Sequence, residues 1–169
     1  MHYLFLILSL FSGILQAPSI SEVRQLYMQS AEDKAAAKKL LEFSEENEDS
    51  ALLLGYKAVA EMMMAKHVFN PLSKMSHFSK GKKDFARALD AEPENVEIRF
   101  LRFSVQSETP DFLGYKENLE QDKKFLFLNL QSMKDRELKK MILQFLTAAK
   151  ALSPAEREEM KNRLLKMQG

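Results

Sequence analysis

Residues 81–95 of the chain read GKKDFARALDAEPEN, a segment that predicts a helix, its end and a turn. Gly81, Phe85 and Ala88 are spaced i, i+4 and i+7, so two small residues and one aromatic ring share a helical stripe. A neighbouring helix can approach closely along such a stripe. Pro93 cannot continue the helix, and it also keeps the residue before it out of the helical region. A new apolar-periodic segment follows at once, so we predict two helices joined by a short turn.

The composition favours helix along the whole chain. Of the 169 residues, 46% are hydrophobic and 29% charged, and only 5 are Gly and 5 Pro. A folded part of about 150 residues can bury roughly two thirds of its surface, so it suits one domain without a metal or a disulfide. The formal net charge of +1 gives no reason to expect a nucleic acid as partner. We expect a single all-helical domain over residues 20–169.

Apolar periodicity and cap residues predict seven or eight helices stacked as antiparallel hairpins, with no sheet. The predicted helices cover 19–30, 35–43, 50–66, 71–91, 94–107, 116–132, 138–152 and 154–168. Ser19 with Glu22, and Ser153 with Glu156, have the spacing of capping boxes. Residues 125–130 could form a short strand by alternation, but the chain offers no second strand-like segment to pair with it.

The N-terminal segment differs from the rest of the chain. Residues 3–11 form the apolar run YLFLILSLF without a charged side chain. This run has the length of a signal-peptide core and is short for a membrane span, which needs about 20 residues. Small residues follow it, so we expect a signal peptide over residues 1–19, with cleavage near Ala17 or Ser19.

The expected localisation is therefore outside the cytoplasm, periplasmic or secreted. The chain has no cysteine and no Asn-x-Ser/Thr glycosylation sequon. These absences exclude a disulfide scaffold, a thiol enzyme and a lipid-modified lipoprotein, and they fit a bacterial periplasm better than a eukaryotic secretory route. No Lys or Arg precedes the apolar run, so a retained anchor or a buried first helix stays open as an alternative.

Motifs that carry catalysis or bind a cofactor are missing from the sequence. Its glycines are isolated, so it has no phosphate-binding loop, and it has neither Gly-x-Ser-x-Gly nor His-Glu-x-x-His. His67 and His77 lie ten residues apart and are more typical of surface or packing residues than of metal ligands. Met62, Met63 and Met64 point in different directions on a helix, which favours core filling over copper binding. We expect no catalytic residue, no cofactor and no metal site.

Charge is distributed unevenly, and it suggests a partner-binding face. Residues 61–87 carry an excess of lysine and arginine, whereas acidic residues cluster on both sides of this range. Arg99, Arg102 and Gln106 lie at i, i+3 and i+7 and share a helix face, which Lys74 of the preceding helix could extend. Guanidinium groups there could bind carboxylates or phosphates of a partner. The alternative interpretation is that the lysines cover a solvated face and the arginines pair with local acids.

The order small, aromatic, small, proline at Gly81, Phe85, Ala88 and Pro93 resembles the second helix and exit turn of a tetratricopeptide repeat. The resemblance covers one half-repeat, residues 81–95. A degenerate second copy keeps the spacing at Ile142, Leu146, Ala149 and Pro154. What the resemblance implies is a protein-binding scaffold built from helical hairpins.

The function expected from the sequence is an exported, non-catalytic protein-interaction module with a protein or peptide partner. Two alternatives remain open. In the first, the protein is a membrane-associated structural protein that keeps residues 3–17 as an anchor, with the basic region facing anionic headgroups. In the second, it is a small-ligand-binding helical domain with a cleft between helices.

Overall fold

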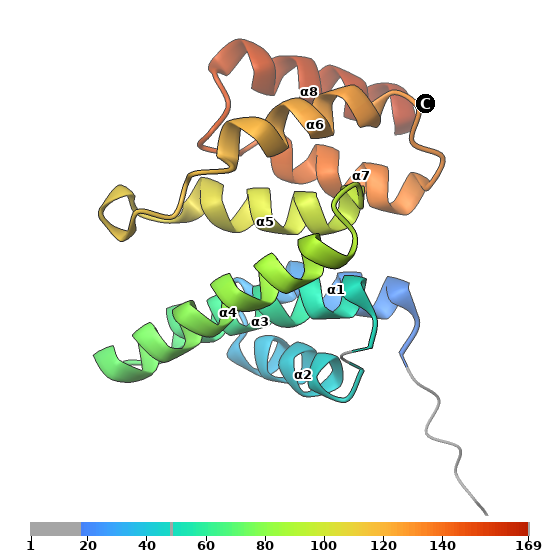
Figure 1. The fold of residues 1–169 in the computed structure, drawn as a ribbon. Helices are drawn as coiled ribbons and strands as arrows, with labels where there is room; N and C mark the ends of the chain where they lie inside the picture. Colours follow the sequence, from blue (N-terminus) through green and yellow to red (C-terminus); the bar gives the residue numbers. More distant parts are fainter. Residues whose placement is uncertain (1–17, 48, 169) are drawn as a thin grey trace, which may run out of the picture.

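The computed structural model describes residues 18–47 and 49–168 and shows eight α-helices, one short 3₁₀ helix and no strand within these ranges (Figure 1). The predicted all-α fold of seven or eight helices is confirmed. The elements are α1 (Ile20–Ser30), α2 (Lys34–Glu45), α3 (Ala51–His67), α4 (Pro71–Ala91), α5 (Val96–Glu108), η1 (Asp111–Leu113), α6 (Leu119–Leu130), α7 (Arg136–Leu146) and α8 (Pro154–Gln168). Residues 1–17 of the predicted signal peptide, including the possible cleavage site at Ala17, lie outside the described residues.

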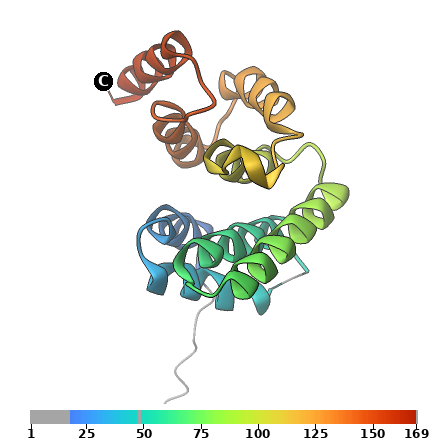
Figure 2. The ribbon, with the colours of Figure 1, turned by 90° about the vertical axis from the view of Figure 1, so that its left-hand side faces the viewer.

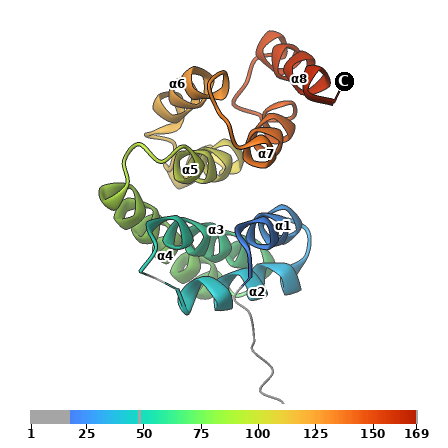
Figure 3. The same cartoon turned by 90° about the vertical axis from the view of Figure 1, so that its right-hand side faces the viewer.

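The helices form two layers that follow the order of the chain. Helices α1 to α4 make one layer and α5 to α8 the other, with the long α4 running obliquely toward the turn that enters α5 (Figures 1 and 2). Within the layers α2 packs on α1 and on α3, α3 on α4, α5 on α6 and α7 on α8, while α3 and α4 contact α5 across the layers. Figure 3 shows the layers from the side, with α5 and α7 facing α1, α3 and α4.

Side-chain caps begin most of the helices, and the two capping boxes predicted from the sequence are among them. Ser19 and Glu22 form a complete capping box on α1, and Ser153 and Glu156 exchange the equivalent hydrogen bonds at α8. The Asn70 side chain accepts from two backbone amides of α4, with Pro71 in the first turn. Because each cap satisfies amides that a helix leaves unpaired, these local signals could be located in the sequence.

Gly81 marks the closest approach of two helices. A methyl group added there would lie 2.8 Å from the Ala58 carbonyl oxygen and 2.9 Å from Met62 Cγ, both on α3. Phe85 and Ala88 of the same stripe are buried. The predicted close contact along this stripe is confirmed, and the helix that makes it is α3, the partner of α4 in the first layer.

The prediction that one helix continues from residue 138 to residue 152 is wrong. Helix α7 ends at Leu146, and the chain then turns through residues 147–152. Ala149 and Leu152 are nevertheless buried. The Ala151 amide donates to the Ser107 hydroxyl of α5 at 3.3 Å, a contact between distant segments that the local apolar period does not reveal. The degenerate second repeat copy is therefore not carried by one continuous helix.

Helix length and apolarity also bear on membrane insertion. Among residues 18–47 and 49–168, no helix has the length and hydropathy that crossing a bilayer requires.

Candidate functional site

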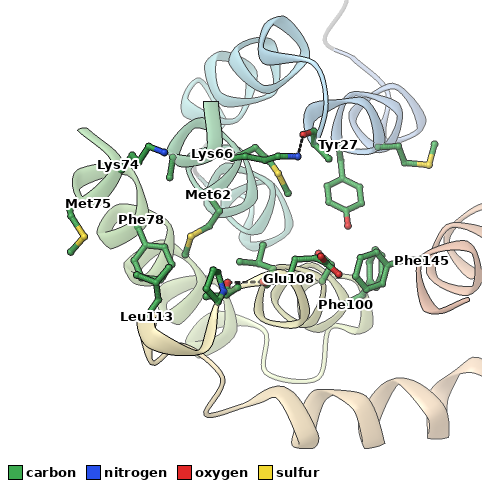
Figure 4. Close-up of a pocket in the computed structure, with 18 of the residues that line it drawn as sticks. Tyr27, Met62, Lys66, Lys74, Met75, Phe78, Phe100, Glu108, Leu113 and Phe145 are labelled. Atoms are coloured by element: carbon green, nitrogen blue, oxygen red, sulfur yellow. Dashed lines mark hydrogen bonds between the residues drawn. The ribbon is translucent and has the colours of Figure 1, made fainter. Parts of the chain in front are cut away.

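A cleft of about 730 Å³ lies between the two layers. Helices α1, α3 and α4 line it from one layer, and α5, η1 and α7 line it from the other (Figure 4). Most of its lining is made of methionine, aromatic and aliphatic side chains. Ligand sites in proteins are commonly apolar clefts of about 300–1,000 Å³ with a few polar groups, so this cleft is the candidate functional site.

Aromatic rings in edge-to-face contact form the floor of the cleft. The Tyr27 ring of α1 lies 6.0 Å from the Phe100 ring of α5, and Phe100 lies 5.7 Å from the Phe145 ring of α7. Figure 4 shows Tyr27 reaching from α1 toward these two rings. Tyr56 of α3 extends the series with a ring 6.1 Å from that of Tyr27. Such pairs have a preferred geometry. The rings of the floor therefore connect the two layers in a defined arrangement.

Burial also affects the Tyr27 hydroxyl. It raises the pKa of Tyr27 to about 12, while the nearby Ser104 hydroxyl acts in the opposite direction. The phenol therefore stays neutral at physiological pH.

Methionines make the walls of the cleft adaptable. Five of them line it, and they come from four different helices: Met28, Met62, Met63, Met75 and Met141. A methionine side chain is unbranched, flexible and polarizable, so it can fit apolar groups of different shapes. Met62 and Met63 were interpreted from the sequence as core filling. Met62 is buried and Met63 half-buried, yet both face the cleft.

The edges of the cleft expose large apolar side chains. Met75 of α4 is 59% exposed, and Phe112 of η1, on the opposite edge, is 85% exposed. Phe69 and Leu72, beside the start of α4, are 97% and 81% exposed but do not belong to the lining of the cleft. Met28 of α1 is also exposed. Apolar groups gathered around a concave apolar surface are typical of an interaction site, whereas single exposed residues are not.

The edge that carries Phe112 is held against α4 by the residues that follow it. Tyr115 is buried, its ring lies 5.7 Å from the Phe78 ring, and Lys82 Nζ lies 4.9 Å from the Tyr115 ring centroid. Burial raises the pKa of Tyr115 to about 12. Gly114 has φ of +58°, a left-handed conformation that glycine adopts without strain. Phe112 is thus presented to solvent on a segment that Tyr115 anchors.

The charged groups at the cleft differ in whether they already have partners. Lys66 pairs with Glu32 at 3.0 Å and also donates to the Ala31 carbonyl oxygen. Glu108 pairs with Lys150 at 2.6 Å. Lys74 is exposed on α4 at the cleft, and in the part of the chain that the structure describes its side chain makes no ion pair or hydrogen bond. It is therefore available to an anionic group of a ligand.

A buried ionic cluster beside the cleft joins the layers. Arg24 of α1 donates twice to Glu97 of α5, at 2.8 Å for each bond, and it also bonds Asp135 and Glu137 at the start of α7. The Tyr56 hydroxyl donates to the same Glu97 carboxylate. The hydrogen bonds that Arg24 donates to Glu97 raise the pKa of Arg24 above its ordinary value, although burial opposes the rise. Planar bidentate pairing fixes α1 relative to α5 and so contributes to the width of the cleft.

The ionic cluster also shifts the pKa values of Tyr56 and Asp135. Burial raises the pKa of Tyr56 above its ordinary range, and the Glu97 charge adds to the rise. At Asp135 burial acts to raise the pKa, but bonds from the Leu138 amide and from Arg24 outweigh it, so the pKa is lowered. Glu97 and Asp135 thus act as hydrogen-bond acceptors for a guanidinium that remains charged.

The predicted partner-binding residues are divided between two places. Arg99 and Arg102 point to α6, where they bond the fully buried Asp122 at 3.1 and 2.7 Å. Gln106 lies on the same face and is fully buried. Only Lys74 belongs to the lining of the cleft. Partner binding through the two arginines and Gln106 stays a prediction, and the contacts that the structure gives the arginines are intramolecular.

The two histidines of the folded part each contact another helix. His67 Nε2 lies 2.9 Å from the Ser30 carbonyl oxygen, and His77 Nδ1 contacts the buried Glu61 carboxylate. Within residues 18–47 and 49–168, no group of three or more His, Asp or Glu side chains is arranged to hold a metal ion. Both histidines therefore connect helices, His67 joining α3 to α1 and His77 joining α4 to α3.

No protein-family model, curated protein or solved structure matches the chain. The fold and the cleft are therefore the basis for its classification, as an all-α protein with an apolar cleft between two helical layers.

Sequence reasoning missed most of the cleft. Tyr27, Phe100 and Phe145 lie within the predicted helices, but the period of one helix does not say which distant helix it faces. No local signal therefore marks these aromatic residues as the lining of a cleft.

Proposed function

We propose that the protein is a non-catalytic interaction module that binds an apolar segment of a protein partner in the cleft between its two layers. The observation that carries the proposal is the combination of the cleft with the uncovered apolar side chains at its edges, of which Phe112 and Met75 are the most exposed. A bound segment that fills the cleft and covers these side chains would remove a large apolar surface from water.

Two further parts of the proposal are a tetratricopeptide-like scaffold and export from the cytoplasm. A scaffold of tetratricopeptide-like hairpins is supported by the close α3 to α4 contact at Gly81 and by the turn at Pro93 that leads into α5. Export is supported by the apolar run at residues 3–11 and the small residues after it. An exported binding module of this kind would meet its partner in the periplasm or outside the cell.

A second candidate function is binding of a small amphiphile, such as a fatty acid, in the same cleft. The observation that favours it is the volume of about 730 Å³, which lies in the range of small-molecule pockets. Such a ligand would fill the cleft but would leave Met75 and Phe112 at its edges largely uncovered. The uncovered edges therefore favour the protein segment as the ligand.

The proposal is tested with a synthetic 18-residue helical peptide that has a Leu and Met face and a neutral Gln and Ser face. Binding to the full chain is measured by fluorescence anisotropy. We expect Met75→Asp combined with Phe112→Asp to weaken binding at least about tenfold, because an apolar contact on each edge of the cleft is replaced by a charge. Both side chains are mainly exposed, so the melting temperature should change little.

Leu128→Asp is the matched control, because Leu128 is 79% exposed on α6 and does not line the cleft. It should leave peptide binding unchanged. Equal losses from the control and the double variant would show that binding is nonspecific and would overturn the proposal. Dodecanoate binding that resists the double variant, without any peptide binding, would establish the second candidate instead.

A further inference from the structure

We propose that the partner segment is an amphipathic helix whose polar border is acidic on the side that faces Lys74. This inference rests on the proposed function, because it specifies the chemistry of the segment that the cleft binds. It follows from three features: the scarcity of free hydrogen-bonding groups in the cleft, the extent of the apolar edges and the difference in charge between those edges.

The lining has few groups that could pair with the backbone of a ligand, and the exposed Gln144 side chain is one of them. The Ser104 hydroxyl donates to the Leu101 carbonyl oxygen at 2.8 Å, and the Thr109 hydroxyl donates to the Val105 carbonyl oxygen at 2.8 Å. An extended peptide would leave its amides and carbonyls unpaired against methionine and aromatic side chains, which is costly. A helix pairs these groups internally, so it can present side chains alone to the cleft.

The shape of the site distinguishes a helix from a flat or a small partner. The cleft is a concave volume of about 730 Å³, which a flat membrane surface would leave unfilled. The exposed apolar residues lie on both edges, Met75 on α4 and Phe112 on η1. A helix lying along the cleft can place anchors inside it and cover both edges.

The two edges differ in the charge that they leave unpaired. On the edge formed by η1 and the end of α5, Asp111 pairs with Lys116, and Glu108 pairs with Lys150. Lys116 lowers the pKa of Asp111, so that carboxylate is ionised and already neutralised by its partner. On the α4 edge, Lys74 makes no ion pair among the described residues. A carboxylate on the bound helix would complement this lysine, and a lysine on the bound helix would be repelled.

The test uses four fluorescent 18-residue peptides with the full chain. Three share one apolar face and differ only at the residues bordering it, which are Glu, Gln or Lys. The fourth has the composition of the Glu peptide with its apolar residues spread around the helix. We expect the Glu peptide to bind about fivefold more tightly than the Gln peptide and the Lys peptide to bind more weakly, as expected for exposed charge pairs. Helicity measured by circular dichroism should rise on binding.

Lys74→Glu should remove or reverse this ranking. The matched control is Lys83→Glu, because Lys83 is exposed on the same helix and lies outside the cleft lining. That variant carries the same change of charge and should keep the ranking.

Each of the remaining experimental results would refute a different part of the proposal. Equal binding of the Glu, Gln and Lys peptides would refute the acidic border and leave the proposed function standing. Equal binding of the rearranged peptide would refute the amphipathic helix. Failure of all four peptides would refute the proposed function itself. Partition of the full chain onto phosphatidylglycerol vesicles that Met75→Asp combined with Phe112→Asp abolishes, without peptide binding, would identify a membrane as the partner of the exposed apolar edges.

Discussion

Two glycines on neighbouring helices have different surroundings and should respond differently to the same substitution. At Gly81 a new methyl group would lie 2.8 Å from a backbone oxygen of α3, which cannot move aside cheaply. At Gly55 the nearest atoms belong to the Ile98 side chain at 3.4 Å, an ordinary contact distance. Small residues at helix contacts therefore have to be judged by what lies opposite them.

We expect Gly81→Ala to destabilise the protein by about 1–3 kcal/mol, because overpacking exceeds the gain of about 1 kcal/mol in helix propensity. Gly55→Ala should be neutral or slightly stabilising. The free energies of unfolding come from urea titrations of both variants. A stabilised Gly81→Ala protein would contradict the close approach of α3 and α4.

At the scale of single helices, the carboxylates of the helix caps make the stability of the protein depend on pH. The Glu156 carboxylate accepts from the Ser153 amide at 2.7 Å. Hydrogen bonds from the Ser153 backbone and side chain lower the pKa of Glu156 below its ordinary value of 4.5. Backbone and side-chain bonds from Ser19 act in the same direction on Glu22. Because the folded pKa is lowered, this stabilisation is complete above about pH 4.5 and is lost as the pH falls through the folded pKa.

Glu156→Gln should therefore lower the melting temperature at pH 7 and make a smaller difference at pH 3, because the stabilisation by the ionised carboxylate decreases below the ordinary pKa of 4.5. The amide can still accept the cap hydrogen bond, but it carries no charge to interact with the start of α8. Thermal melts of both proteins at the two pH values measure the difference. Glu158→Gln, in the same turn, controls for loss of one exposed charge. An equal effect of Glu156→Gln at both pH values would exclude a role for ionisation.

For the whole molecule, the Arg24 cluster is the main polar connection between the layers. Arg24 and Glu97 are both almost fully buried, and their side chains come from α1 and α5. We expect Arg24→Ala to cost about 3–5 kcal/mol, because it leaves the Glu97 carboxylate buried without its cation. Chemical denaturation of the variant measures this loss.

Arg163→Ala is the control for Arg24→Ala. It removes an exposed pair with Glu159 on α8, and such pairs contribute about 0.3–0.5 kcal/mol. A loss below about 1 kcal/mol for Arg24→Ala would mean that packing across the layers, rather than the ionic cluster, holds them together.

How far the sequence allowed prediction depended on the range of the interaction. The caps at Ser19 and Ser153 and the small stripe at Gly81 could be identified because they act within a few residues. The end of α7 was missed because a bond from Ala151 to Ser107 competes with continuation of the helix. The lining of the apolar cleft could not be predicted either, because it comes from six elements far apart in the chain.

The sequence by itself determined the all-α class, most helix starts and the close-contact stripe on α4, because periodicity, capping and proline act locally. Only the tertiary structure decided which faces meet. It turned Arg99 and Arg102 inward to Asp122, joined Arg24 to Glu97 and left Met75 and Phe112 uncovered on opposite edges of one cleft. The physical reason is that helical periodicity fixes which side chains share a face, whereas packing between distant helices determines what that face meets.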